Sequence, residues 1–146
     1  MTFVAAGCGA DLPEDIRNYE TLCTPMATAG PYDDDPHSGN KRIFACNVDK
    51  AFLAAGTRPF PDGTIIVKES TKPRQCAPWL IATMRKQAGK WSWAEYTRNF
   101  ADEDFGELLV PSSTCTGCHD DAKDADWVFS QFSLAAASAK ICAGQP

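Results

Sequence analysis

The stretch TIIVKES, residues 64–70, decides the fold class of this chain. It is rich in β-branched side chains and follows a Pro-Asp-Gly turn at residues 61–63, so we expect it to be a strand. Two more stretches of β-branched and aromatic residues, 78–85 and 90–97, come next and are joined by a short loop at Gly89. Short connections join antiparallel neighbours, so these segments predict an antiparallel sheet.

The flanking sequence adds one more strand and three helices. Residues 42–48 have strand composition, and Asp49 is placed to cap a short helix that ends at Gly56. A helix is expected over residues 12–19 and a longer one over about 125–140. The long helix would bury five apolar side chains, which are Trp127, Val128, Phe129, Phe132 and Leu134. The pattern predicts an α+β fold, mainly antiparallel β-sheet.

A Cys-x-x-Cys-His motif lies near the C-terminal end, at residues 115–119. This spacing is typical of c-type haem attachment, in which Cys115 and Cys118 bond to the haem vinyl groups and His119 is the proximal iron ligand. The alternatives are half of a zinc site or a disulfide. A zinc site needs a second ligand pair, and Cys142 stands alone downstream. We therefore expect one covalent haem c.

The position of the motif narrows the class of haem protein. Small class I cytochromes carry the motif near the N-terminus and a methionine ligand after it, but no methionine follows His119 here. Four-helix cytochromes c′ do carry a C-terminal motif, but strand candidates precede this one. A sheet-based haem protein remains. A six-coordinate electron-transfer cytochrome would need a sixth ligand such as Met84, Met26 or His37, the only other histidine.

Length and charge restrict the other function classes. The 146 residues fit one domain, and we expect a flexible segment over residues 1–11 and a single haem domain over 12–146. A formal net charge of −5 argues against nucleic acid as a partner. Residues 4–8 resemble the end of a bacterial lipoprotein signal, so Cys8 is a candidate lipid anchor, or alternatively an unmodified or disulfide-bonded thiol.

The remaining cysteines indicate an oxidising compartment. Apart from the motif pair, the chain contains Cys8, Cys23, Cys46, Cys76 and Cys142. If Cys8 is the anchor, the other four form two disulfides, for which three pairings exist. We favour Cys46–Cys76, because both residues flank neighbouring strand candidates. Disulfides and covalent haem both predict a periplasmic or cell-surface protein.

The chain resembles the cytochrome P-460 and cytochrome c′-beta family. Three segments carry the match: FPDGTIIVKE at residues 60–69, Trp-Ser-Trp at 91–93, and residues 115–132, which include an Asp-Trp-Val-Phe sequence. The similarity spans most of residues 12–134. It implies an antiparallel sheet with flanking helices, a homodimer, and a haem iron held by one protein histidine and open on its other face.

The resemblance implies two activities. In cytochromes P-460 a lysine of this strand is cross-linked to the haem, and the enzyme oxidises hydroxylamine; Lys68 matches that lysine by position. This implies an oxidoreductase for hydroxylamine or a related small nitrogen species, with a redox partner protein. Cytochromes c′-beta instead bind nitric oxide behind phenylalanines, for which Phe44 is the candidate distal wall and Phe60 a second candidate.

Other polar residues are weaker candidates for the site. Cytochromes P-460 use a polar or acidic distal residue to move protons, and Glu95 and Glu103 are the carboxylates considered for that role. Three arginines are candidates for pairing with the haem propionates: Arg42, Arg85 and Arg98.

Overall fold

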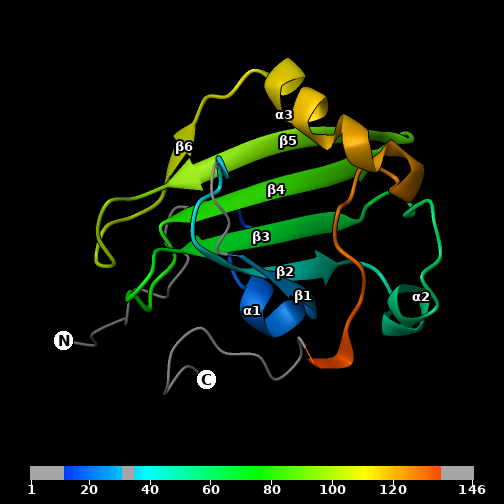
Figure 1. Cartoon of the computed structure of the whole chain (residues 1–146), viewed down its shortest axis with the longest axis horizontal. Coiled ribbons are helices and arrows are strands. Elements are labelled where there is room, and N and C mark those ends of the chain that lie inside the picture. The colour runs from blue at the N-terminus through cyan, green and yellow to red at the C-terminus, as the bar shows by residue number, and fades with distance from the viewer. Residues whose placement is uncertain (1–11, 31–34, 136–146) are drawn as a thin grey trace.

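In the computed structural model, which describes residues 12–30 and 35–135, the strands form one antiparallel sheet. Each strand pairs with its neighbours in the sequence, so the sheet is a simple meander (Figure 1). The strands are β1 (Thr24–Ala29), β2 (Asn40–Cys46), β3 (Ile65–Thr71), β4 (Leu80–Gln87), β5 (Lys90–Thr97) and β6 (Gly106–Leu108). The helices are α1 (Tyr19–Leu22), α2 (Lys50–Ala54) and α3 (Ser112–His119), followed by the 3-10 helix η1 (Asp120–Ala125).

This arrangement confirms the predicted α+β fold with a mainly antiparallel sheet. The four central strands lie within two residues of their expected bounds at every end. The two edge strands were missed. β1 contains Pro25 and small residues and is interrupted by a bulge between Pro25 and Ala27, while β6 has three residues, all exposed. Edge strands of this kind lack the β-branched alternation that marks a central strand.

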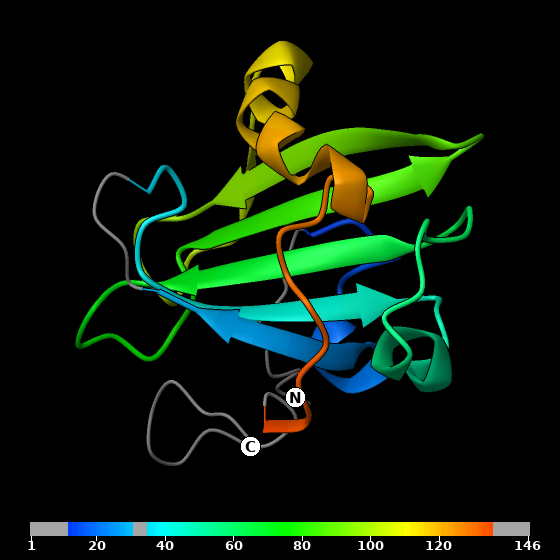
Figure 2. The same ribbon diagram turned by 45° about the vertical axis from the view of Figure 1, so that its right-hand side comes forward.

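The two faces of the sheet pack against different parts of the chain. Successive side chains of a strand point to opposite faces. One face buries a core with the N-terminal segment and α1, including Leu12, Ile16 and Tyr19. The other face is covered by residues 127–132, which contribute Val128, and by side chains near α2. Figure 2 shows the segment after η1, in orange, running across this second face.

The chain after η1 is not the helix that the sequence predicts. Asp126 and Trp127 both adopt left-handed backbone angles, with φ of 57° and 67°, and these angles end the helical path. The segment then runs without regular helix across the sheet and reaches β1. There the Ser133 N–H donates a hydrogen bond to the Met26 carbonyl at 2.8 Å. Within the described part of the predicted helix, Val128 is buried, but Phe129 and Leu134 are 55% and 71% exposed. Residues 136–140 of that prediction lie outside the described residues.

The disulfide expectation was also wrong. Cys46 is bonded to Cys23, which joins the end of α1 to the end of β2. Cys76 is disulfide-bonded as well. In the register of β2 and β3, Cys46 lies opposite Ile65, at the start of β3, whereas Cys76 follows the end of β3. The two cysteines are therefore at opposite ends of the sheet. Cys8, Cys142 and the expected segment over residues 1–11 lie outside the described residues.

Among the helices of the described residues, none is long and apolar enough to cross a membrane.

Candidate haem site

The helix α3 presents the motif residues on one side. It begins at Ser112, directly after Pro111, and ends at His119. Cys115, Cys118 and His119 stand at positions i, i+3 and i+4, which lie on the same face of a helix. Both thiols are free, with Cys118 exposed and Cys115 half-buried. The chemistry of this donor set fits a haem bonded through two thioethers and one imidazole.

The His119 ring is oriented for a metal on its far nitrogen. Its Nδ1 lies 2.7 Å from the Trp127 carbonyl oxygen. Because a carbonyl only accepts, Nδ1 carries the hydrogen, and Nε2 has its lone pair free for iron. Burial lowers the pKa of the imidazole, which favours the neutral form that binds a metal. The rings of Trp93 and Phe129 lie 4.6 and 4.9 Å from the His119 ring.

Asp126 anchors the turn that supports His119. Its carboxylate accepts from the Phe60 N–H at 2.8 Å and from Lys86 Nζ at 2.5 Å, and its carbonyl accepts from Trp91 Nε1 at 2.8 Å. These contacts tie β4, β5 and the loop before β3 to the left-handed turn at residues 126 and 127. The next carbonyl, that of Trp127, is the one that receives the His119 hydrogen. The sequence offered one signal for this anchor, the aspartate of the Asp-Trp-Val-Phe sequence.

Lys68 lies on the same face of the sheet as His119. In the strand register it occupies one row with Ile43, Ala82 and Glu95. Burial lowers the pKa of the Lys68 ammonium, an effect opposed by the nearby carboxylates of Asp35 and Glu95. The charge of Lys68 in turn contributes to lowering the pKa of His119. The structure thus brings the predicted Lys68 into the electrostatic neighbourhood of the motif histidine.

Glu95 and His37 form a contact that sequence reasoning did not find. His37 Nε2 lies 2.6 Å from Glu95 Oε1, and the two side chains are 16% and 13% exposed. Of the two carboxylates considered for a distal role, only Glu95 belongs to the Lys68 row. Glu103 instead accepts from the backbone N–H groups of Asn99 and Phe100 in an exposed loop. The only sequence signal for the pair was the rarity of histidine, which suggested His37 as an iron ligand.

Phe44 does not lie on this face, which corrects its assignment as the distal wall. Phe44 pairs with Val67, the residue before Lys68. Because successive side chains of a strand point to opposite faces, Phe44 lies on the face of the sheet that Lys68 does not occupy. There it is 2% exposed and packs edge-on against the Tyr19 ring at 5.1 Å. Phe60 is on the motif side but packs with Phe52 and Trp91, toward the turn between β4 and β5.

The other candidate residues have protein partners. Met26 and Met84 are buried in the apolar core. The arginines considered for the propionates are used within the chain: Arg42 pairs with Glu69, Arg85 with Asp15, and Arg98 donates to backbone carbonyls.

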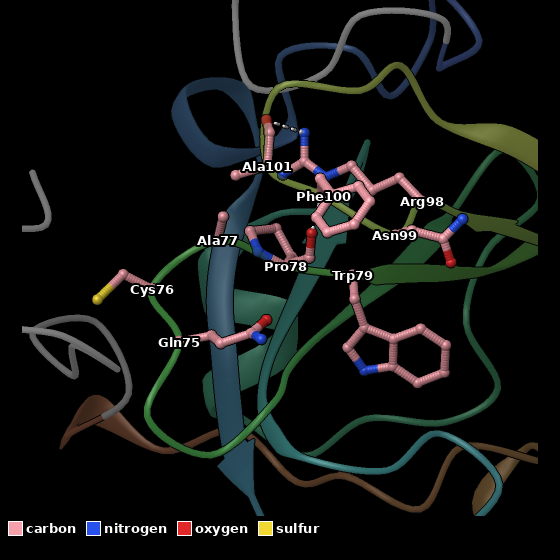
Figure 3. A pocket seen from close by; sticks show the side chains of 9 residues that line it. All are labelled: Gln75, Cys76, Ala77, Pro78, Trp79, Arg98, Asn99, Phe100 and Ala101. Atoms are coloured by element: carbon pink, nitrogen blue, oxygen red, sulfur yellow. Dashed lines mark hydrogen bonds between the residues drawn. The ribbon is translucent and has the colours of Figure 1, made fainter.

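Two cavities lie beside strand β5 and the loop that follows it. One, of about 300 Å³, lies beside the motif and is lined by β5, the β6 region and α3, including Trp93, Glu95, Leu109 and Cys115. The other, of about 330 Å³, lies between the loops that follow β3 and β5 (Figure 3). Its one charged lining residue, Arg98, is already bonded to the carbonyls of the surrounding loops. Its lining contains no residue of the haem motif, whereas the lining of the first cavity includes Cys115.

Comparison with known protein families agrees with this geometry. The family model for cytochrome P460 matches residues 13–130, which is most of the chain and includes the sheet, Lys68 and the Cys-x-x-Cys-His motif. The chain belongs to the cytochrome P460 family. It is therefore a cytochrome, and membership implies a haem cofactor, which the motif residues fit. A search of curated proteins finds no match.

Proposed function

We propose that this cytochrome P460 family member oxidises hydroxylamine or a related small nitrogen species at a single covalent haem c. Cys115 and Cys118 would form the thioether bonds, and His119 Nε2 would bind the iron. The observation that carries the proposal is the placement of two charged side chains, Lys68 and Glu95, in one row on the His119 face, with only Ala82 between them. Glu95 also contacts His37. A site that only holds nitric oxide needs no such groups.

The reaction explains why a carboxylate is needed. Two molecules of hydroxylamine give nitrous oxide, water, four protons and four electrons, so each substrate molecule loses two protons. A haem held by Cys115, Cys118 and His119 would supply the redox chemistry of the reaction. We assign Glu95 as the general base of this site. Its carboxylate lies on the His119 face of the sheet and is held by His37, so it is positioned to accept a proton from the substrate. The electrons leave to a one-electron acceptor protein.

Lys68 is the residue that we assign to the haem edge. Its lowered pKa increases the share of neutral amine, the form that can bond to a porphyrin carbon. Forming that bond would remove one hydrogen from the amine and one from the haem carbon, with two electrons passing to an oxidant of the peroxide class. A cross-linked protein would therefore be two hydrogens lighter than the sum of its parts.

The alternatives gain less support from the residues. A nitric oxide carrier of the c′-beta type would use an apolar distal wall, but Phe44 is on the opposite face. An electron-transfer cytochrome would need a sixth ligand, but the methionines are core residues and His37 contacts Glu95. We retain a periplasmic or cell-surface location, a homodimer and an anchor through Cys8 as parts of the proposal; the disulfide of Cys23 supports an oxidising compartment.

Intact mass and turnover of the haem-loaded protein test the proposal. We expect one haem per chain, a loss of two hydrogens beyond thioether attachment, and hydroxylamine-dependent reduction of an electron acceptor. Lys68→Met should keep the haem attached, lose the mass difference and change the visible spectrum. Lys72→Met is the matched control, because Lys72 lies beyond the end of β3 against the Trp79 ring. An unmodified Lys68 with an unchanged spectrum would remove Lys68 from the site, and absence of turnover would refute the oxidoreductase.

A further inference from the structure

We propose that His37 is a positioning residue for Glu95: it donates a hydrogen bond from Nε2 to Oε1 and holds the carboxylate in the orientation that its role as a base requires. The inference rests on the proposed function, since it gives Glu95 a base role. It goes further by assigning His37, a residue of an irregular loop, to the same site as Lys68, Glu95 and His119. His37 would act through Glu95 and need not touch the substrate or the iron.

The first support is the geometry of the contact. The distance between His37 Nε2 and Glu95 Oε1 is 2.6 Å, slightly shorter than the roughly 2.7–2.9 Å usual for charge-assisted N–H···O hydrogen bonds. Both side chains are mostly shielded from water, at 16% and 13% exposure. Shielding of this kind makes a hydrogen bond to a carboxylate stronger than one at the surface. An ionised carboxylate only accepts, so the shared hydrogen belongs to His37 when Glu95 is ready to act as a base.

The second support is that the loop holds His37 in place. The His37 N–H donates to Asp35 Oδ1 at 2.9 Å, and its carbonyl accepts from the Ser70 hydroxyl at 2.8 Å. The next carbonyl, that of Ser38, accepts from Trp79 Nε1 at 3.0 Å. The loop is therefore fixed to β3 and to the residue before β4. Because the backbone at His37 is already held, forming the hydrogen bond to Glu95 costs less conformational entropy than it would for a histidine on a free loop.

The third support is the charge around the pair. Asp35 forms an ion pair with Lys41, so these two charges largely cancel. Lys68, from β3, faces Glu95 and attracts its carboxylate. His119, from α3, is close enough for the charge of His37 to act on it.

The experiment compares His37→Leu with His37→Gln, which keeps an N–H donor. By the usual strength of a hydrogen bond to a charged group, His37→Leu should lower kcat/KM by about tenfold, through kcat rather than KM. His37→Gln should recover most of the loss. Because Glu95 acts on the chemical step, kcat should fall while the affinity for nitric oxide, which needs no base, stays unchanged.

Two further measurements keep the outcome decisive. Trp79→Phe removes a loop anchor but leaves His37 and Glu95 intact, so an equal loss of kcat/KM in this variant would show that loop packing is responsible and would overturn the assignment. The 15N shifts of the His37 ring should report hydrogen on Nε2 in the wild type and change in Glu95→Leu. No change there would also overturn it. If turnover is absent but the ring shifts respond, the proposed reaction fails while the His37–Glu95 contact stands.

Discussion

Replacing Asp126 with alanine should be among the most damaging single changes in the described part of the chain. The carboxylate of Asp126 is 13% exposed and pairs with Lys86, whose side chain is 5% exposed. Removing one partner of a buried ion pair costs about 3–5 kcal/mol, because the other charge is left uncompensated. The partial exposure of Asp126 places this pair at the lower end of the range.

Other losses occur at the same residue. The Phe60 N–H loses its acceptor, and an unpaired buried donor costs about 1–3 kcal/mol, although this cost overlaps with the first. Alanine also tolerates the left-handed backbone of residue 126 less well than aspartate, by about 1 kcal/mol. Since such terms are not additive, we expect a loss of about 4 kcal/mol in the free energy of unfolding.

Equilibrium unfolding in urea measures this loss as a shift of the midpoint at constant slope. With about 2.1 cal/mol/K of unfolding entropy per residue, the melting temperature should fall by about 10 °C or more. Asp126→Asn, which keeps an acceptor oxygen and tolerates left-handed angles, should lose about half as much. Asp124→Ala is the matched control: Asp124 is exposed in η1, and its replacement should stay within about 0.5 kcal/mol.

The reasoning fails if Asp126→Ala and Asp124→Ala destabilise the protein equally. It also fails if replacing Lys86 by methionine in the Asp126→Ala variant recovers none of the lost stability, since coupled charges predict that the double mutant regains part of the loss.

Three further changes test other parts of the structure. Phe44→Ala should destabilise the protein by about 3–5 kcal/mol, as in other cores, yet leave the haem spectrum unchanged, and a spectral change would restore Phe44 to the distal site. Cys23→Ser should cost about 3 kcal/mol in urea unfolding, because the Cys23–Cys46 bond spans 23 residues, and unaltered stability would argue against that pairing. The pKa of Asp15 is lowered by its hydrogen bond to Arg85, so the stabilisation is present above the ordinary value of 3.8 and lost as pH falls through the lowered pKa. Asp15→Asn should therefore flatten the acid end of the stability profile by less than about 1 kcal/mol, given the exposure of the pair.

The central strands and the motif could be predicted because local sequence decides them. A run such as residues 64–70 has few alternatives to a strand, and the spacing of Cys115, Cys118 and His119 is dictated by the chemistry of haem attachment. It was harder to predict which side chains of different strands share a face of the sheet. Phe44 and Lys68 were assigned to one site, but their side chains point to opposite faces of the sheet. Which residues share a face depends on the register between two strands, and the sequence of one strand does not determine that register.

The remaining errors arose where distant parts of the chain decide the structure. Residues 126–135 have helical composition, but the contacts of Asp126 with Phe60, Lys86 and Trp91 hold its backbone in a left-handed turn. Cys46 could not be paired from sequence because the partner depends on which end of the sheet each cysteine occupies. The His37–Glu95 contact joins residues 58 positions apart, so no local sequence pattern predicts it.

The meander topology also bears on the order in which the molecule can assemble. Every strand pairs with the strand before it in the sequence, so each hairpin can form as soon as its second strand is available. Contacts between near neighbours cost little chain entropy and favour rapid folding. The segment after η1 is different, because Ser133 must return to Met26, across the whole sheet. The sheet can therefore form before α3 is in place, and closure of this last segment would complete the support of His119 at the end.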